Sequence, residues 1–288
     1  MKKTIFYLLS LLLLTACNQA SAPADSQQQA DSLMAEPAAF YDTKPSQAPN
    51  SLEIPKYLQG SEGKILRRVG YTCSYNARNR IPNWVAWHLT ANHVSGHNKR
   101  NNEVFHEDTE VSNPRAYDSD YRGSGYDRGH MCPSGDNKWD KKAQEQSFLF
   151  TNICPQRHNL NTGAWNDVEL QCRAWAKRYG DLYIVCGPVL YDQQHKTIGH
   201  NQVVVPEAFF KVVLRKETRS QGKPYYKAIG FLYENKGASR DMSRYVRSVD
   251  ELEELTGLDF FSLLPDNIEN TIEKQADLRD WYPLREIK

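Results

Sequence analysis

At 288 residues the chain is long enough for one large domain or two small ones. Its hydrophobic residues, 40% of the total with six Trp and sixteen Tyr among them, are numerous enough to form a sizeable core. A net charge of +1 excludes a strongly basic character at the level of the whole chain. If this chain binds phosphate groups, its positive charge must be concentrated at the binding site.

The N-terminus has the features of an export signal. Two lysines precede an apolar run over residues 5–14 that is too short to span a bilayer comfortably. The run ends in the sequence LTAC, which resembles a bacterial lipobox, so we expect Cys17 to become the lipidated first residue of the mature chain. The alternative is an ordinary signal peptide in which this Cys is incidental.

The remaining chain divides by composition into a tether and a domain. Residues 18–54 are rich in Ala, Ser, Gln and Pro and cannot bury enough apolar surface to offset their ordering entropy, so we expect a disordered tether. Residues 55–288 show no internal repeat and no interior linker, which predicts a single α+β domain with a mixed sheet at its core.

Several segments of this domain carry strand or helix patterns. Alternation or continuous apolar runs predict strands at 70–76, 82–89, 182–189, 208–214 and 226–233, with Gly187-Pro188 marking where its strand ends or becomes an edge. Residues 249–255 read as a short helix opened by Ser248 or Asp250 and closed by Gly257. An apolar stripe at Val168, Cys172, Trp175 and Tyr179 predicts a longer helix.

Two histidine and aspartate patterns do not meet the requirements of a metal site. His88, His93 and His97 are spaced like ligands, but the zinc protease signature needs a Glu directly after the first His. The segment 118–123 suggests a calcium loop only faintly, because Arg122 stands where a ligand belongs.

The five cysteines after the signal raise the question of disulfides. In an exported chain, one or two disulfides are plausible, but the pairing cannot be read from the sequence. Zinc is the alternative, although no two of these residues form a Cys-x-x-Cys clip; they are Cys73, Cys132, Cys154, Cys172 and Cys186.

Residues 126–173 contain most of the candidate catalytic and metal-binding residues. His130 follows Asp127 and Arg128, so a base of near-neutral pKa stands beside a fixed cation, although an isolated motif of this kind is more often a satisfied surface cluster. Downstream, Asn161, Glu169 and Arg173 lie at helical spacing. They can be a capping Asn with a surface ion pair, or a metal ligand with a supporting carboxylate, and residue types alone leave both open.

The longer pattern resembles a known family. The sequence YDRGHMCP at 126–133, followed by TNICPQ at 151–156, NLNTGAW at 159–165 and Glu169, is similar to the DNA/RNA non-specific endonucleases. These are ββα-metal (His–Me finger) enzymes, whose relatives include mitochondrial endonuclease G. The similarity extends over about residues 60–270. It implies a ββα-metal motif within the α+β domain and Mg²⁺-dependent hydrolysis of DNA and RNA with little sequence specificity, leaving 5′-phosphate ends.

The resemblance also implies residue roles. His130 is expected to be the general base, Asn161 the direct ligand of one Mg²⁺, and Glu169 a partner of the metal's water molecules. Mn²⁺ is the alternative ion. Asn152 is expected to orient the site and Asp127 to support the water shell of the metal. The expected phosphate contacts are Arg128, Arg100 and Arg173, of which Arg100 lies in a loop that departs from the family's pattern.

The expected partners are DNA and RNA, with a membrane anchor at Cys17 that leaves the domain facing either the periplasm or the cell surface. A homodimer is left open. Three rival readings remain: a lipoprotein that binds nucleic acid or a partner without cutting, a phosphodiesterase acting on another substrate, and a nuclease restricted to DNA or to RNA.

Overall fold

The computed structural model describes residues 51–58, 63–98, 100, 103–191, 193–218, 222 and 224–282. The expected signal peptide, Cys17 and most of the expected tether therefore lie outside the described residues. Within the described ranges, no helix is long and apolar enough to cross a membrane.

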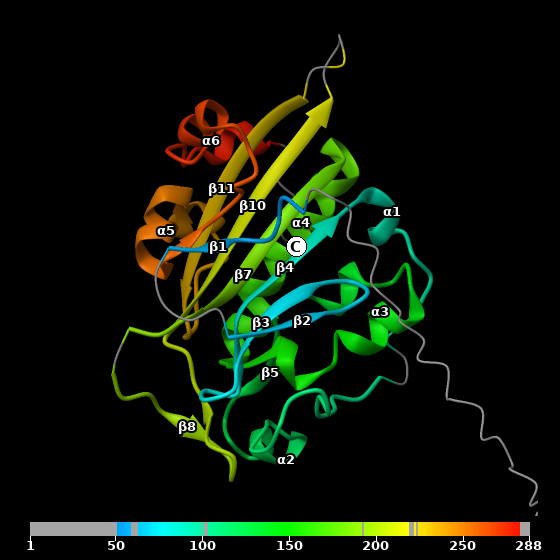
Figure 1. The fold of residues 1–288 in the computed structure, drawn as a ribbon, viewed down its shortest axis with the longest axis vertical. Coiled ribbons are helices and arrows are strands. Elements are labelled where there is room, and N and C mark those ends of the chain that lie inside the picture. Colours follow the sequence, from blue (N-terminus) through cyan, green and yellow to red (C-terminus); the bar gives the residue numbers. More distant parts are fainter. Residues whose placement is uncertain are drawn as a thin grey trace, which may run out of the picture. The chain divides into compact units, whose positions relative to one another are not determined.

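The described part of the chain forms strands and helices, with runs of consecutive strands near its beginning and after α4 (Figure 1). The strands are β1 (Lys56–Tyr57), β2 (Lys64–Arg67), β3 (Thr72–Asn76), β4 (Ile81–Leu89), β5 (Asp127–His130), β6 (Ile153–Gln156), β7 (Asp181–Val189), β8 (Thr197–Ile198), β9 (Val203–Val204), β10 (Ala208–Thr218), β11 (Pro224–Glu234), β12 (Val246–Arg247) and β13 (Leu258–Asp259). The α-helices are α1 (Ala91–Val94), α2 (Asp118–Tyr121), α3 (Lys141–Gln146), α4 (Trp165–Tyr179), α5 (Val249–Thr256) and α6 (Asp266–Ile272).

A seven-stranded sheet forms the centre of the domain, with the order β12-β11-β10-β7-β4-β3-β2. Its ladders are all antiparallel. The α+β class is thus confirmed, but the sheet is antiparallel rather than mixed, because β4 and β7 also meet antiparallel after the long insertion between them. The strands expected from alternation are present, and Pro188 lies beyond the ladder with β4, where that side of β7 is an edge that needs no N–H donor.

Successive residues of β7 point to opposite faces of the sheet and belong to two separate cores. Leu182, Ile184 and Cys186 pack in the first core, whereas Tyr183 and Val185 pack in the second. A sheet buried on both faces needs apolar residues at consecutive positions, which explains why the sequence of this strand is continuously apolar.

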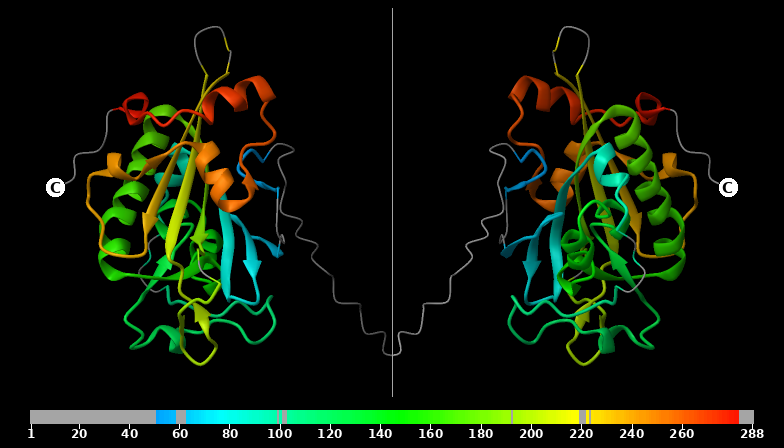
Figure 2. Two further views of the ribbon diagram at one scale, coloured as in Figure 1. Left: turned by 90° about the vertical axis from the view of Figure 1, so that its left-hand side faces the viewer. Right: turned by 90° about the vertical axis from the view of Figure 1, so that its right-hand side faces the viewer.

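Helices cover both faces of the sheet. The stripe expected on α4 is confirmed, because Val168, Cys172 and Trp175 are buried in the first core. Leu252 of α5 and Ile272 of α6 are buried in the second core. Figure 2 shows α4 on one side of the sheet and α5 and α6 on the other.

Helix α5 begins and ends where its sequence predicts. Ser248 is its N-cap, and the Ser248 hydroxyl accepts a hydrogen bond from the backbone N–H of Glu251, whose side chain accepts one in return from the backbone N–H of Ser248. Gly257 follows the last turn with a φ of 68°, a left-handed conformation that favours glycine.

The expectation of one or two disulfides is wrong for the described residues, in which all five cysteines are free and buried. They lie on different elements and pack as small apolar side chains in the first core. Burial raises the pKa of the Cys73 and Cys172 thiols to about 12, so neither forms a reactive thiolate near neutral pH.

We expect a thiol titration to reflect this packing. In the Cys17→Ser variant, a thiol reagent should react with five groups after denaturation without reductant, and with almost none in the native protein, because the thiols are buried and protonated. A count of three or fewer thiols in the denatured, unreduced chain would show that disulfides form.

Candidate active site

A ββα unit built on the first face of the sheet carries the candidate residues. Strands β5 and β6 pair antiparallel, with His130 opposite Ile153 and Gly129 opposite Cys154. A Cβ at Gly129 would lie 2.4 Å from Oε1 of Gln156, so the absence of a side chain allows this close packing. The indole of Trp165, the first residue of α4, donates to the backbone oxygen of His130 at 3.3 Å and joins the helix to β5.

His130 lies in an aromatic pocket. Its ring centroid is 5.2 Å from that of Phe105 and 5.1 Å from that of Phe148. Burial, assisted by the positive charge of Arg100, lowers the pKa of His130 to about 3. The imidazole is therefore neutral over the physiological range, and its Nε2 atom is buried without a hydrogen-bond partner among the described residues.

Asn161 does not lie on α4 but in a π-helical turn that precedes it, Leu160–Ala164. Gly163 leaves helical geometry there, with φ and ψ of −103° and −114°, and separates the turn from the regular helix. The Nδ2 atom of Asn161 donates to Oδ2 of Asp127 at 2.9 Å, and the same oxygen is 2.9 Å from Nδ1 of His158.

These contacts distinguish between the two roles that the sequence allows for Asn161, a helix cap and a metal ligand. The capping role is not observed, because the N-cap of the π-helical turn is Asn159, that of α4 is Ala164, and neither end has a side-chain capping hydrogen bond. With the amide nitrogen of Asn161 engaged by Asp127, the amide oxygen faces away from Asp127, and no described residue donates a hydrogen bond to it. Asp127 thereby places a free oxygen acceptor close to the strand that carries His130.

Asn152 is fully buried and clamps the chain that follows His130. Its Oδ1 accepts from the backbone N–H of Cys132 at 2.9 Å, and its Nδ2 donates to the backbone oxygens of Cys132 and Ser147, both at 2.8 Å. The backbone oxygen of Asn152 also accepts from the N–H of Met131 at 2.9 Å. Through these contacts Asn152 fixes the backbone that follows His130, from a position that exposes none of its surface.

Glu169 lies one turn after Trp165 on α4, in a group of buried charges. Its pKa is raised to about 7 by burial, against the opposing effects of Arg173 and Lys211. Arg173 donates to Oδ1 of buried Asp136 at 2.8 Å and is not part of a surface pair with Glu169. Lys211, only 1% exposed, has its ammonium 4.5 Å from the ring centroid of Trp165.

Two further arginines lie around the aromatic pocket. Arg128 is held by Asp118, with 2.7 Å between its Nε and Oδ1 of the carboxylate, and its guanidinium lies 5.8 Å from the centroid of Phe105. Arg100 is exposed, and its guanidinium lies 5.1 Å from the centroid of Phe148. Both of these candidate phosphate contacts thus adjoin the same pocket as His130, whereas Arg173 is engaged by Asp136.

Sequence reasoning missed several supporting residues. Asp118 holds Arg128, Asp136 holds Arg173, and Lys211 is buried on a strand that the sequence marks only as apolar. These roles depend on contacts between segments that are distant in the sequence. The only local signal for Lys211 is that it is a charged residue within the otherwise apolar segment 208–214. Residues of the two patterns that were rejected as metal sites make other contacts: His88 pairs with Asp181 at 3.0 Å, and Asp120 binds Asn201.

Comparison with known proteins places this geometry in context. Residues 48–267 match the DNA/RNA non-specific endonuclease family, and residues 1–18 match a prokaryotic membrane lipoprotein lipid attachment site. Similar proteins include the mitochondrial nuclease EXOG of Mus musculus, 33% identical with 72% of this chain and 59% of that protein covered. Nuclease C1 of Cunninghamella echinulata is 32% identical, with 75% and 90% covered.

A solved structure gives the same picture. The crystal structure of the EndoG/EndoGI complex contains a chain that superposes with a TM-score of 0.66 at 30% identity, covering 73% of this chain and 91% of the other. The chain spans about three-fifths of the length of the mitochondrial EXOG relatives that it matches.

The clamp formed by Asn152 leads to a stability prediction. Asn152→Ala leaves buried backbone groups of Cys132 and Ser147 without partners, so we expect the free energy of unfolding to fall by about 3 kcal/mol or more. The control is Asn159→Ala, at an exposed position without a side-chain capping bond, which should cost less than about 0.5 kcal/mol. Urea unfolding measures both, and equal small losses would contradict the clamp.

The charges around Glu169 lead to a pH prediction. In the metal-free protein Glu169 should take up a proton as the pH falls through about 7, and Lys211→Met should move this midpoint to higher pH because a positive charge that favours the carboxylate is lost. Infrared difference spectra of isotope-labelled carboxyl groups measure the midpoint. Lys216→Met, further along β10, should leave it unchanged; an unshifted midpoint in Lys211→Met would refute the coupling.

Proposed function

The chain belongs to the DNA/RNA non-specific endonuclease family, and from this premise we propose that it hydrolyses phosphodiester bonds of DNA and RNA with the help of a divalent metal ion. The single observation that carries the proposal is the arrangement around β5. A neutral His, whose buried nitrogen has no partner among the described residues, lies on the same strand as the Asp that turns the amide oxygen of Asn161 outward. A base and a hard oxygen donor are what metal-assisted hydrolysis requires.

The donor set fits Mg²⁺. Asn161 offers one amide oxygen, and the half-buried carboxylate of Glu169 has no hydrogen bond from another described residue. Such a small protein set suits an ion that usually keeps several of its water molecules, which Glu169 and Asp127 would hold by hydrogen bonds. When bound, Mg²⁺ or Mn²⁺ would neutralise phosphate charge and stabilise the leaving 3′-oxygen.

In the proposed reaction His130 acts as the general base. Its neutral imidazole takes a proton from a water molecule, the water oxygen bonds to phosphorus, the bond from phosphorus to the 3′-oxygen breaks, and the departing oxygen takes a proton from solvent water. The products are a 5′-phosphate and a 3′-hydroxyl. Because the aromatic pocket keeps the imidazole deprotonated, no pH-dependent activation of the base is needed near neutrality.

Because the net charge of the whole chain is close to zero, the arginines at the site must supply the positive charge for phosphate locally. Arg128, fixed by Asp118, is positioned to bind a phosphate oxygen, and exposed Arg100, which lies beside the same aromatic pocket, can bind another. Arg173 acts mainly by favouring the ionised form of Glu169, with a direct phosphate contact as the alternative from the sequence. Contacts of this kind to the phosphate backbone carry no base preference, which accounts for low sequence specificity.

The match of residues 1–18 to a lipoprotein attachment site supports the lipid anchor at Cys17. We propose that the anchored domain of residues 55–288 acts in the cell envelope, facing the periplasm or the cell surface, on nucleic acid that reaches it there. A homodimer remains compatible with this proposal.

The assay that tests the function follows from the role of His130. We expect the purified protein to digest plasmid DNA and RNA with Mg²⁺ and not with EDTA, and His130→Ala to lower the rate about 10²- to 10⁴-fold through loss of the base. His200→Ala, an exposed control, should retain the full rate.

Each outcome separates the rival readings. Full activity in EDTA or in His130→Ala would remove the mechanism. Binding of nucleic acid without cleavage would favour a lipoprotein that only binds, and cleavage of one nucleic acid alone would restrict the substrate. Hydrolysis of small phosphodiesters but neither polymer would favour a phosphodiesterase of another class.

A further inference from the structure

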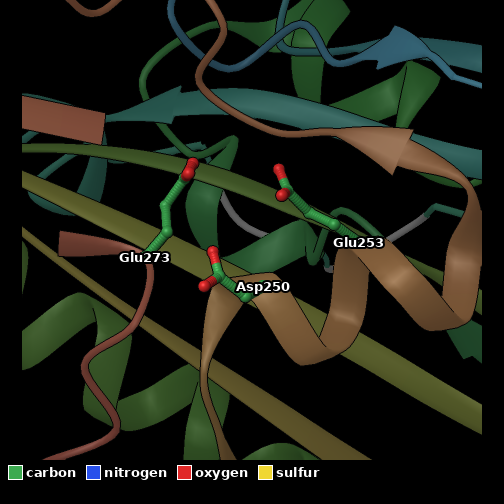
Figure 3. A group of neighbouring side chains, drawn as sticks. All are labelled: Asp250, Glu253 and Glu273. Carbon is green, nitrogen blue, oxygen red and sulfur yellow. The ribbon is translucent and has the colours of Figure 1, made fainter. Parts of the chain in front are cut away.

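Three carboxylates converge on the other face of the domain. Asp250 and Glu253 project from α5, and Glu273 lies directly after α6, so that one oxygen of each lies within 4.8 Å of one oxygen of both others. Figure 3 shows the three side chains reaching into one space between the two segments. Among the described residues, this is the one group of three or more His, Cys, Asp or Glu side chains with such spacing.

Glu273 is the unusual member of the group. It is only 5% exposed, and its Oε1 atom is buried without a hydrogen-bond partner among the described residues. Its backbone is tightly held, because its carbonyl oxygen accepts from the N–H groups of Val249 and Asp250 at 2.9 and 3.3 Å. A buried polar atom without a partner is costly, so the Oε1 atom of Glu273 lacks the ligand or donor that would offset its burial among the described residues.

The surroundings offer acid groups and little positive charge. Residues 248–273 contain eight Asp or Glu and no Lys or Arg. Burial and the neighbouring carboxylates raise the pKa of Glu273 to about 9 and that of Glu253 to about 7. Burial also raises the pKa of two further acids nearby, Asp259 and Glu269, against the opposing effect of Lys56.

We propose that Asp250, Glu253 and Glu273 bind a calcium ion. Calcium takes six to eight oxygen ligands at about 2.3–2.6 Å, so two ligands on opposite sides of the ion lie about 5 Å apart, which agrees with the spacing of the three carboxylates. The three side chains offer up to six oxygens, although one oxygen of Glu253 also accepts from the N–H of Phe260 at 2.8 Å. Water completes the shell at Asp250, which is accessible to solvent.

The ion would join α5 to the segment after α6. Both helices pack on the second core, whereas the candidate active site lies over the first core, so the calcium site is structural and independent of the proposed function. Glu273 also lies outside residues 48–267, the part of the chain that matches the family. Asp250 and Glu253 lie within that range, so the proposed site combines residues from inside and outside it.

The test measures calcium binding with the candidate catalytic ligand removed. In the Asn161→Ala protein at a pH of about 8, calorimetry should detect one Ca²⁺ per chain, and calcium at about a hundred times Kd should raise Tm by about 5 °C. Asp250→Asn and Glu273→Gln should each raise Kd at least about tenfold and remove most of the Tm shift. Glu254→Gln is the matched control, an exposed acid on the same helix outside the cluster, and should change neither value.

Two results would overturn the proposal. One is the absence of calcium binding and of a Tm shift in the Asn161→Ala protein, and the other is an equal loss in Glu254→Gln, which would indicate diffuse attraction to an acidic surface. Asp250→Asn should leave Mg²⁺-dependent cleavage unchanged, so failure of the calcium site and failure of the nuclease proposal give different results.

Discussion

The hydrogen bond between Asp127 and Asn161 is the contact on which the candidate site depends. It joins β5, which carries His130, to the π-helical turn that begins the helical half of the ββα unit. A carboxylate can only accept hydrogen bonds, so an amide beside it must turn its NH₂ group toward the carboxylate. The amide oxygen then points to the opposite side. In the proposed site Asp127 would orient the metal ligand Asn161, as outer groups commonly do.

A second constraint is the burial of charge beneath the site. Asp136, Glu169, Arg173 and Lys211 lie between α4, the sheet and the short turn at Ser134–Asp136. Burying such groups is expensive unless each has a partner, and removing one member leaves another uncompensated. The two cations offset the desolvation of Glu169, so that its carboxylate can ionise near neutral pH. The ionisation of Glu169 therefore depends on correct packing of α4 on the sheet.

Much of the fold was predictable because the residues within each strand or helix indicate that element without knowledge of its distant contacts. Alternation marked the strands at 72–76 and 81–89, and a capping Ser with a closing Gly marked α5. Asn161 was assigned to the face of a regular helix because its spacing from Glu169 fits one, and only the geometry of Gly163 shows that the helix begins later. The disulfide expectation failed since cysteine count and export say nothing about distances between buried thiols.

The site was predictable in its residue types but not in their supports. The long motif pattern pointed to His130, Asn161 and Glu169, while the buried clamp at Asn152 became specific only with its three partners. The affinity for Mn²⁺, measured by paramagnetic titration, tests the central claim most directly. Asp127→Ala should weaken binding about 10- to 100-fold, whereas His158→Ala, which removes the other partner of the same carboxylate oxygen, should change it little. Equal affinities in Asp127→Ala and the unaltered protein would contradict the account.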